Sequence, residues 1–267
     1  MFDSGTLWTD IEKIRNTGPL VHNITNFVVM NTTANALLAI GASPIMAHAP
    51  EEMEDLVGIV NALVLNIGTL RGPWIQSMKT AGALAKKRSL PIVLDPVGAG
   101  ASRLRTDTAL QLLEEVSPAI LRGNSSEIMA LAGQVGGTKG VDSTMASDAA
   151  ANAADILAER FGCVVVVSGA VDLITDGTKN VRLTGGSPML PRVTGMGCTA
   201  SCLAGAFSAV NPSAFEAAVH AMAIMDVASE LAQEQSQGPG TLQLHFLDAL
   251  YALKRQELEV RFPMIAA

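Results

Sequence analysis

The stretch Cys163-Val164-Val165-Val166-Val167 decides the fold class, because it is a short, uninterrupted apolar run that ends directly at Ser168-Gly169. Two runs of the same kind precede it, Leu63-Val64-Leu65-Asn66-Ile67 and Pro91-Ile92-Val93-Leu94-Asp95. This pattern is typical of strands that are buried on both faces, as in a parallel sheet. Weaker strand candidates are Leu20–His22, Ser43–Met46, Ala119–Leu121 and Leu173–Thr175.

Alanine-rich amphipathic stretches lie between these runs. Pro50-Glu51-Glu52 opens one helix, since proline suits a first turn and acids favour the positive end of the helix dipole. Further helices are expected over residues 73–88 and 144–161, and from a Ser213 cap to Leu231. The alternation predicts an α/β sandwich, with helices on both faces of a mostly parallel sheet.

Composition limits the number of domains. The chain has 267 residues, of which 49% are apolar and 16% are charged, so it has enough material for a large core and is unlike a disordered chain. Its most flexible stretches, Gly136–Gly140 and Gln235–Gly240, are too short to separate domains. We therefore expect one domain over residues 1–267.

The charge balance excludes several partners. The net charge is −7 and the longest basic run is Lys86-Lys87-Arg88, which argues against nucleic acid. No stretch approaches the length of a membrane span, so no membrane partner is expected. The first residues carry acids where a signal peptide needs a basic start, and three cysteines imply no disulfide framework. These features favour the cytoplasm.

The strongest local signal for chemistry is Gly195-Met196-Gly197-Cys198, which a run of small residues follows. Glycines there allow a turn that other residues disfavour, and the small run can begin a helix whose first N–H groups bind an anion. A tight turn before a closely packed helix explains the same residues equally well. A dinucleotide fingerprint would need a preceding strand and an acid about 20 residues later, but the acid there, Glu216, fits a helix cap better.

Cys198 stands at this expected helix start, where the dipole favours a thiolate, so nucleophile, base and buried packing residue all remain open. Cys202 follows at i+4 and shares its helix face. The histidines form no zinc-binding pattern, so structural zinc is not expected.

Polar residues follow several of the expected strands. Asp95 ends a buried strand before a glycine loop, at the edge where α/β sheets bind ligands. Arg122 follows another strand and can grip phosphate with its forked donors. Asn124 and Glu127 have the spacing of a helix cap, which is the better interpretation for them, and Glu127 can alternatively reach Mg²⁺. Ser168 is a small hydroxyl residue at the end of the valine strand.

Six segments in this order resemble the hydroxyethylthiazole kinase family, part of the ribokinase-like superfamily. The segments are Pro19–Asn26, Gly41–Met46, Leu65–Thr69, Asp95–Ala99, Arg122–Glu127 and Gly195–Cys198. The likeness spans roughly residues 10 to 260. The resemblance implies a ribokinase-like three-layer αβα sandwich. It also implies ATP- and Mg²⁺-dependent phosphorylation of the hydroxyl of 4-methyl-5-(2-hydroxyethyl)thiazole, which salvages the thiazole half of thiamine.

The resemblance also implies roles for individual residues. Gly195, Gly197 and Cys198 would form the anion hole, with Cys198 as the catalytic residue where related kinases carry an aspartate. Arg122, Ser168 and Thr194 would bind ATP, although the family commonly has threonine at position 168. Asp95 and Glu127 would hold magnesium. Met46, Gly195 and Asn23 would line the thiazole pocket.

The family forms homotrimers with active sites at subunit boundaries, so a homotrimer is expected here. Two alternatives stay open: a kinase for hydroxymethylpyrimidine or a related vitamin precursor with the same fold, and a ligand-binding homologue that has lost catalysis. The full set of Asp95, Arg122, Glu127 and Gly195–Cys198 argues against the second alternative.

Overall fold

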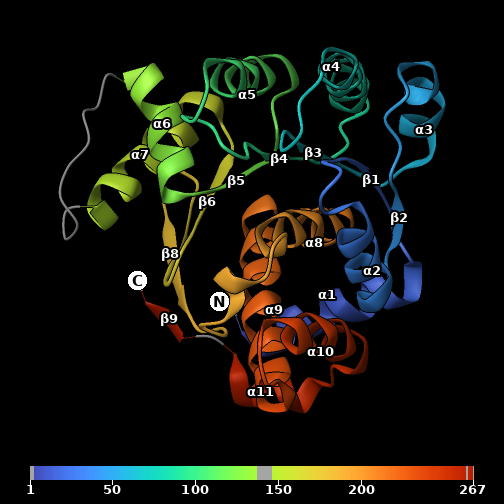
Figure 1. The fold of residues 1–267 in the computed structure, drawn as a ribbon, viewed down its shortest axis with the longest axis vertical. Coiled ribbons are helices and arrows are strands. Elements are labelled where there is room, and N and C mark those ends of the chain that lie inside the picture. Colours follow the sequence, from blue (N-terminus) through green and yellow to red (C-terminus); the bar gives the residue numbers. More distant parts are fainter. Residues whose placement is uncertain (1–2, 137–145, 263, 267) are drawn as a thin grey trace.

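The computed structural model describes residues 3–136, 146–262 and 264–266, and within them nine strands form one sheet in the order β2-β1-β3-β4-β5-β6-β7-β8-β9 (Figure 1). The strands are β1 (Leu20–Ile24), β2 (Ser43–Ile45), β3 (Ala62–Asn66), β4 (Ile92–Asp95), β5 (Ile120–Asn124), β6 (Val164–Ser168), β7 (Asp172–Thr175), β8 (Asn180–Thr184) and β9 (Met264–Ala266).

Helices flank the sheet in two groups. The α-helices are α1 (Ser4–Thr17), α2 (Met30–Ile40), α3 (Met53–Ile59), α4 (Gly72–Lys87), α5 (Arg103–Val116), α6 (Ser125–Gly136), α7 (Ala146–Phe161), α8 (Met196–Val210), α9 (Ala214–Gln235), α10 (Pro239–Ala252) and α11 (Arg255–Arg261). Two short 3₁₀ helices, η1 (Pro50–Glu52) and η2 (Leu190–Arg192), complete the chain. Helices α3 to α7 cover one face of the sheet, and α1, α2 and α8 to α11 cover the other (Figure 1).

Alternation along each strand builds the two cores. Val64 packs into the cluster on the α8 face, whereas its neighbours Leu63 and Leu65 pack into the cluster on the α4 face. Successive side chains of a strand point to opposite faces, so a continuous apolar run supplies both cores at once. The structure thus confirms the α/β sandwich with a mostly parallel sheet.

Strands β1 to β6 run parallel to one another. Strands β7, β8 and β9 then extend the sheet through antiparallel pairs. The parallel register sets Asn66 beside Asp95 and Asn124 beside Ser168 at the carboxyl edge. Polar residues at strand ends therefore meet at one edge.

All seven expected strands are present, within three residues of the predicted bounds. The sequence analysis did not identify β8, in which buried and more exposed residues alternate, or helices such as α1, α2 and α10. The helix expected over 144–161 is α7, and residues 144 and 145 lie outside the described part, as do residues 137–140 of the glycine stretch. Helix α9 continues four residues past the expected end. No helix among the described residues is long and apolar enough to cross a membrane.

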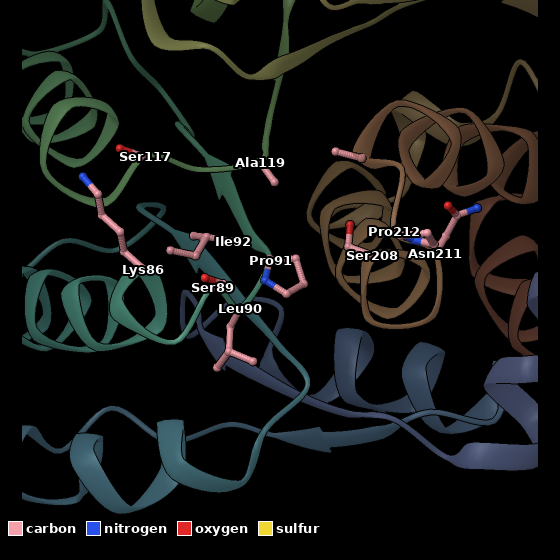
Figure 2. A pocket seen from close by; sticks show the side chains of 11 residues that line it. Lys86, Ser89, Leu90, Pro91, Ile92, Ser117, Ala119, Ser208, Asn211 and Pro212 are labelled. Atoms are coloured by element: carbon pink, nitrogen blue, oxygen red, sulfur yellow. The ribbon is translucent and has the colours of Figure 1, made fainter.

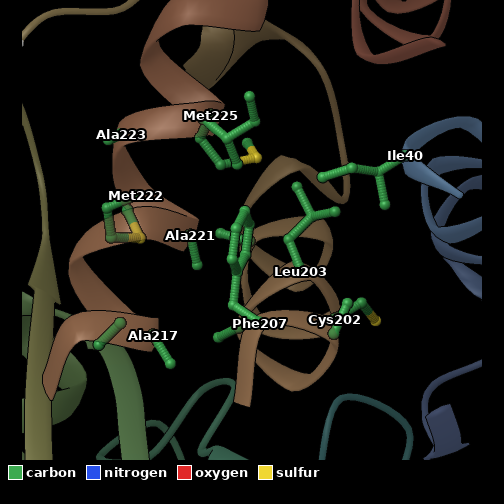
Figure 3. Packing of buried hydrophobic residues seen from close by; sticks show 14 of the residues in the cluster. Ile40, Cys202, Leu203, Phe207, Ala217, Ala221, Met222, Ala223 and Met225 are labelled. Atoms are coloured by element: carbon green, nitrogen blue, oxygen red, sulfur yellow. The ribbon is translucent and has the colours of Figure 1, made fainter. Parts of the chain in front are cut away.

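Helix α8 lies close against the sheet because its residues are small. A Cβ on Gly205 would lie 2.6 Å from Cγ2 of Val64, so the helix backbone rests almost directly on β3. On its other side α8 packs against α9 through Phe207, which Figure 3 shows beside Ala221. This close approach places the first turn of α8 at the carboxyl edge of the sheet.

Gly205→Ala is expected to destabilise the protein by about 1–3 kcal/mol, because Val64 is buried and stiff and the methyl group overpacks the contact. Denaturant unfolding measures this. Gly58→Ala in α3 is the matched control, since nothing lies within 4 Å of its added Cβ and a helical alanine gains up to about 1 kcal/mol. A stabilised Gly205→Ala variant would contradict the tight contact.

Candidate active site

The candidate residues gather at the carboxyl edge of the parallel strands. Asn66 ends β3, Asp95 ends β4, Arg122 lies in β5 and Ser168 ends β6. The first turn of α8, which begins at Met196, faces these four strand ends. Residues more than a hundred positions apart in the chain thus meet in one place.

Asp95 is the centre of the polar contacts. Its Oδ2 accepts hydrogen bonds from Asn66 Nδ2 at 2.9 Å and from Ser201 Oγ at 2.7 Å, and Arg122 Nη1 lies 4.0 Å away. Burial raises the pKa of Asp95 to about 6, although Arg122 and the Ser201 hydrogen bond act against this increase. A carboxylate inside the protein is retained here by two hydrogen-bond donors and one nearby guanidinium.

Both glycines of the Gly195–Cys198 turn have a geometric reason. Gly195 precedes α8 with a φ of +84°, and a Cβ there would lie 2.7 Å from Val29 Cγ1. A Cβ on Gly197 would lie 2.5 Å from Nη1 of Arg122, so the guanidinium rests on the first turn of α8. Unpaired N–H groups at a helix start and a guanidinium beside them form a site for an anion.

Arg122 is held from several sides. Its Nη2 donates to Ser168 Oγ, and its side chain is 11% exposed. Its Nε is buried and has no hydrogen-bond partner among the described residues. The guanidinium therefore has a fixed position and unused donor capacity, which suits it to binding phosphate.

Glu127 caps helix α6, as the spacing predicted. Its Oε2 accepts from the Asn124 backbone N–H at 2.8 Å, and Asn124 Oδ1 accepts from the Glu127 N–H at 3.0 Å. Its Oε1 accepts from the Gly98 N–H at 2.8 Å, in the loop that follows β4. The carboxylate is thus fixed beside the Asp95 loop rather than free in solvent.

The donor set fits a magnesium ion that arrives with phosphate and water. Asp95 and Glu127 are carboxylates at this edge, and no group of three or more metal-binding side chains exists among the described residues. Mg²⁺ commonly uses one or two carboxylates, with substrate phosphates and waters as its other ligands. The carboxylates described at this site therefore suit Mg·ATP.

Cys198 lies in the first turn of α8, and Asn26 Nδ2 is 3.5 Å from its Sγ. Burial, with the charge of Asp95 as a second cause, raises the pKa of the Cys198 thiol to about 11. Cys198 is therefore a neutral thiol at pH 7, and the helix dipole does not make it a thiolate.

The remaining expected residues differ in their surroundings. Met46 follows β2 and is half-buried, and Thr194 is exposed before the Gly195 turn. Asn23 is 1% exposed, and its Oδ1 accepts from the buried Cys202 thiol at 3.0 Å. The polar groups of Asn23 are thus used inside the protein. The asparagine beside Cys198 is Asn26, which the sequence analysis did not single out.

Asn66, Ser201 and Asn26 are site residues that the sequence analysis missed. Asn26 donates to Asn66 Oδ1 at 2.8 Å and so links the loop after β1 to the Asp95 contacts. Their only sequence signal is a polar residue at the end of a strand candidate or within a run of small residues. That signal does not say which partner each one meets.

A separate cavity of about 350 Å³ lies at the opposite, amino edge of β4 and β5 (Figure 2). Lys86, Ile92 and Ser208 are among its lining residues, and no candidate site residue is. The carboxylates, Arg122 and the glycine turn before α8 all lie at the other edge of the sheet.

The structure excludes the dinucleotide fingerprint. Gly195 follows the 3₁₀ helix η2 and Val193-Thr194 rather than a buried strand. Glu216 lies in the first turn of α9, where its N–H is capped by Ser213 Oγ at 3.2 Å. Neither requirement of that motif is met.

Comparison with known proteins gives a consistent result. The model of the hydroxyethylthiazole kinase family matches residues 11–256. This chain belongs to that family. Its relatives include the hydroxyethylthiazole kinases of Nitratidesulfovibrio vulgaris (strain Miyazaki F), 60% identical over 96% of both chains, and of Syntrophus aciditrophicus, 53% identical over 97% of this chain and 96% of the relative.

Solved structures agree with this membership. The hydroxyethylthiazole kinase protein of Pyrococcus horikoshii has a TM-score of 0.91 and 40% identity, and 98% of each chain is covered. The pyridoxal kinase of Staphylococcus aureus, in complex with AMP-PCP and pyridoxal, has a TM-score of 0.61 at 17% identity, covering 79% of this chain and 87% of the other. The second likeness concerns the fold alone, and it confirms the ribokinase-like architecture.

Two further buried acids lie near the end of β6. Asp172 Oδ1 accepts from the Gly169 N–H at 2.9 Å, and burial raises its pKa to about 6. Asp226 of α9 is 6% exposed, and its Oδ2 has no hydrogen-bond partner among the described residues. Burial, followed by repulsion from Asp172 and Glu230, raises the pKa of Asp226 to about 8.

The Asp226→Asn substitution is expected to stabilise this protein at high pH. The folded Asp226 binds a proton that the unfolded chain releases above its ordinary pKa of 3.8, so the free energy of unfolding falls as pH rises from about 4 to about 8. The isosteric amide removes this loss, and its melting temperature should exceed that of the parent by several degrees at pH 9 and differ little at pH 4.

Thermal unfolding across this pH range makes the measurement. Asp107→Asn, which changes an exposed carboxylate of α5, is the control and should follow the parent at every pH. An Asp226→Asn curve parallel to that of the parent would contradict the raised pKa.

Proposed function

We propose that this family member transfers the γ-phosphoryl group of ATP to the hydroxyl of 4-methyl-5-(2-hydroxyethyl)thiazole. The relatives named above carry that activity in their names, and the chain matches them over nearly its whole length. The observation that carries the proposal is the position of Arg122, which rests on Gly197 at the start of α8 with Asp95 4.0 Å away. One cation, one helix start and one carboxylate meet where a phosphoryl group would be transferred.

The anion hole is the part of this site that supports phosphoryl transfer most directly. The transition state is loose and places charge on the oxygens of the transferred group, so fixed donors supply most of the catalysis. The N–H groups of Gly197 and Cys198 in the first turn of α8 are such donors, since a helix leaves its first N–H groups unpaired. Gly195 allows the chain to enter that turn with a positive φ.

ATP would bind through Arg122, Ser168 and Thr194. Arg122 supplies positive charge to the phosphates, and the hydroxyl of Ser168, which is bonded to Arg122, lies at the end of β6. Thr194 is exposed directly before the anion hole, where its hydroxyl is free to meet a phosphate oxygen.

Magnesium would be held by Asp95 and Glu127, in part through water. When bound, the ion neutralises charge on the phosphates. Asp95 is enclosed by donors on Oδ2, and Glu127 is fixed by two backbone N–H groups. Both carboxylates are therefore held in place by groups of the protein itself.

Cys198 would orient the substrate alcohol rather than act as its resting base. Its thiol is neutral at pH 7 because its pKa is raised to about 11. A loose transition state develops little need for an early base, because the alcohol loses its proton as the new P–O bond forms. The thiol is already protonated and does not take up that proton, which passes to an oxygen of the transferred phosphoryl group or to water.

The thiazole would lie between Met46 and Gly195, with Asn23 supporting the pocket through its contact with Cys202.

We include a homotrimer in the proposal, because Phe27 and Val28, beside the Asn26 loop, are 50% and 64% exposed and a second copy can cover them. One kinase domain over residues 1–267 and a cytoplasmic location also belong to it, and the free thiols of Cys163, Cys198 and Cys202 support that location.

The activity is tested by ADP release with Mg·ATP, with the hydroxyethylthiazole and, in parallel, with hydroxymethylpyrimidine. Turnover with the thiazole alcohol is expected, with at most a trace with the pyrimidine. Turnover with the pyrimidine alone would overturn the pocket assignment. No turnover with either, despite ATP binding, would indicate a homologue that has lost catalysis.

Cys198→Ala is expected to lower kcat by about tenfold or more, because the alcohol loses its orienting partner. The pH–rate profile between pH 6 and 9 should keep its shape, since the thiol stays neutral over that range. Cys163→Ala, at a buried cysteine directly before β6 and away from the site, is the comparison for a mere packing change. A loss in kcat well under tenfold would leave Cys198 with a packing role only.

A further inference from the structure

Arg105 reaches the carboxyl edge from helix α5 and binds three main-chain carbonyls. Its Nη1 donates to Ile67 O at 3.1 Å and to Val97 O at 2.6 Å, and its Nη2 donates to Gly68 O at 2.7 Å. Ile67 and Gly68 follow β3 directly, and Val97 lies two residues after the end of β4. One guanidinium therefore joins the exits of two neighbouring strands.

Local helix energetics do not favour an arginine at this position. Arg105 lies in the first turn of α5, which is the positive end of the helix dipole. This turn contains no acidic residue. Its own N–H is capped by Ser102 Oγ at 3.4 Å. A cation in that turn is kept by its tertiary contacts and not by the helix itself.

The first loop that Arg105 holds supports Glu127. Gly98 has a φ of +75°, and a Cβ there would lie 3.1 Å from Cδ of Arg105, so the turn lies directly on the arginine. The N–H of the same glycine donates to Glu127 Oε1 at 2.8 Å. A shift of Arg105 would therefore move a donor of Glu127.

The second loop supports Asp95. The Gly68 N–H donates to Asn66 Oδ1 at 3.0 Å, and Asn66 Nδ2 donates to Asp95 Oδ2 at 2.9 Å. The carbonyl of that glycine is a partner of Arg105. Both carboxylates at this edge thus depend on loops that the same guanidinium ties together.

We propose that Arg105 is a positioning residue that sets the separation of Asp95 and Glu127 for Mg²⁺-bound nucleotide, without touching the nucleotide. Both of its Nη atoms are directed at backbone carbonyls. A planar fork with several donors can hold two loops in register, which the single ammonium of lysine cannot. This inference rests on the proposed function, since it assigns the two carboxylates to magnesium.

The test uses Arg105→Lys, which keeps the charge and loses the fork. Arg103→Lys is the matched control, because Arg103 is exposed in the same helical turn. Calorimetry measures ADP affinity with and without Mg²⁺, and kinetics give kcat and the KM values for Mg·ATP and for the thiazole alcohol. Melting temperatures report folding.

The gain in ADP affinity that Mg²⁺ confers should fall about tenfold or more in Arg105→Lys, as for residues that orient metal ligands indirectly. The KM for Mg·ATP should rise and that for the thiazole should stay within about twofold of the parent value. Arg103→Lys should match the parent. Gly98→Ala adds a methyl group that presses against Arg105 in the same turn, so it should reproduce the nucleotide and Mg²⁺ effects.

An Arg105→Lys variant with a lower melting temperature and an unchanged Mg²⁺ effect on ADP binding would overturn the inference, as would an equal rise in both KM values. If Arg105→Lys does not fold, Gly98→Ala decides by the same two readouts. The binding measurement needs no turnover. A parent that binds Mg·ADP but phosphorylates no thiazole would overturn the proposed function, while the Mg²⁺ effect would still test Arg105.

Discussion

Asp95 imposes the constraint on which the rest of the site depends, because a carboxylate at 1% exposure must be compensated from within the protein. Its Oδ2 takes donors from β3 and α8, and a guanidinium from β5 lies 4.0 Å away. Each donor fixes another element. Asn66 sets the exit of β3, Ser201 sets the depth of α8, and Arg122 must lie where position 197 carries no side chain.

The small residues of α8 follow from the same constraint. Ser201 reaches Asp95 only if the helix lies close to the sheet, and Gly205 allows that approach by leaving room for Val64. The helix start is then carried to the carboxyl edge, where its unpaired N–H groups face Arg122. Core packing and the anion site are two results of one close contact between a helix and a sheet.

The buried charge also explains the chemistry assigned to Cys198. Burial and the neighbouring Asp95 both disfavour a thiolate, and they outweigh the hydrogen bonds and the Arg122 charge that favour it. The Arg122 guanidinium, which would bind phosphate, lies beside the Asp95 carboxylate. Both charges act on the pKa of the Cys198 thiol. Burial first, and the charge of Asp95 second, thus keep Cys198 neutral.

Local patterns by themselves determined seven of the strands, the α/β class and the caps at Asn124 and Ser213, because these depend on residues within a few positions of one another. The order of six motifs was enough to place the chain in its family. Only the tertiary structure decided the partners of Asp95, which lie 29 and 106 positions away, the role of Arg105 across two loops and the raised pKa of Cys198. The physical reason is that burial and convergence of strand ends are properties of the packed sheet, and no short stretch of sequence contains them.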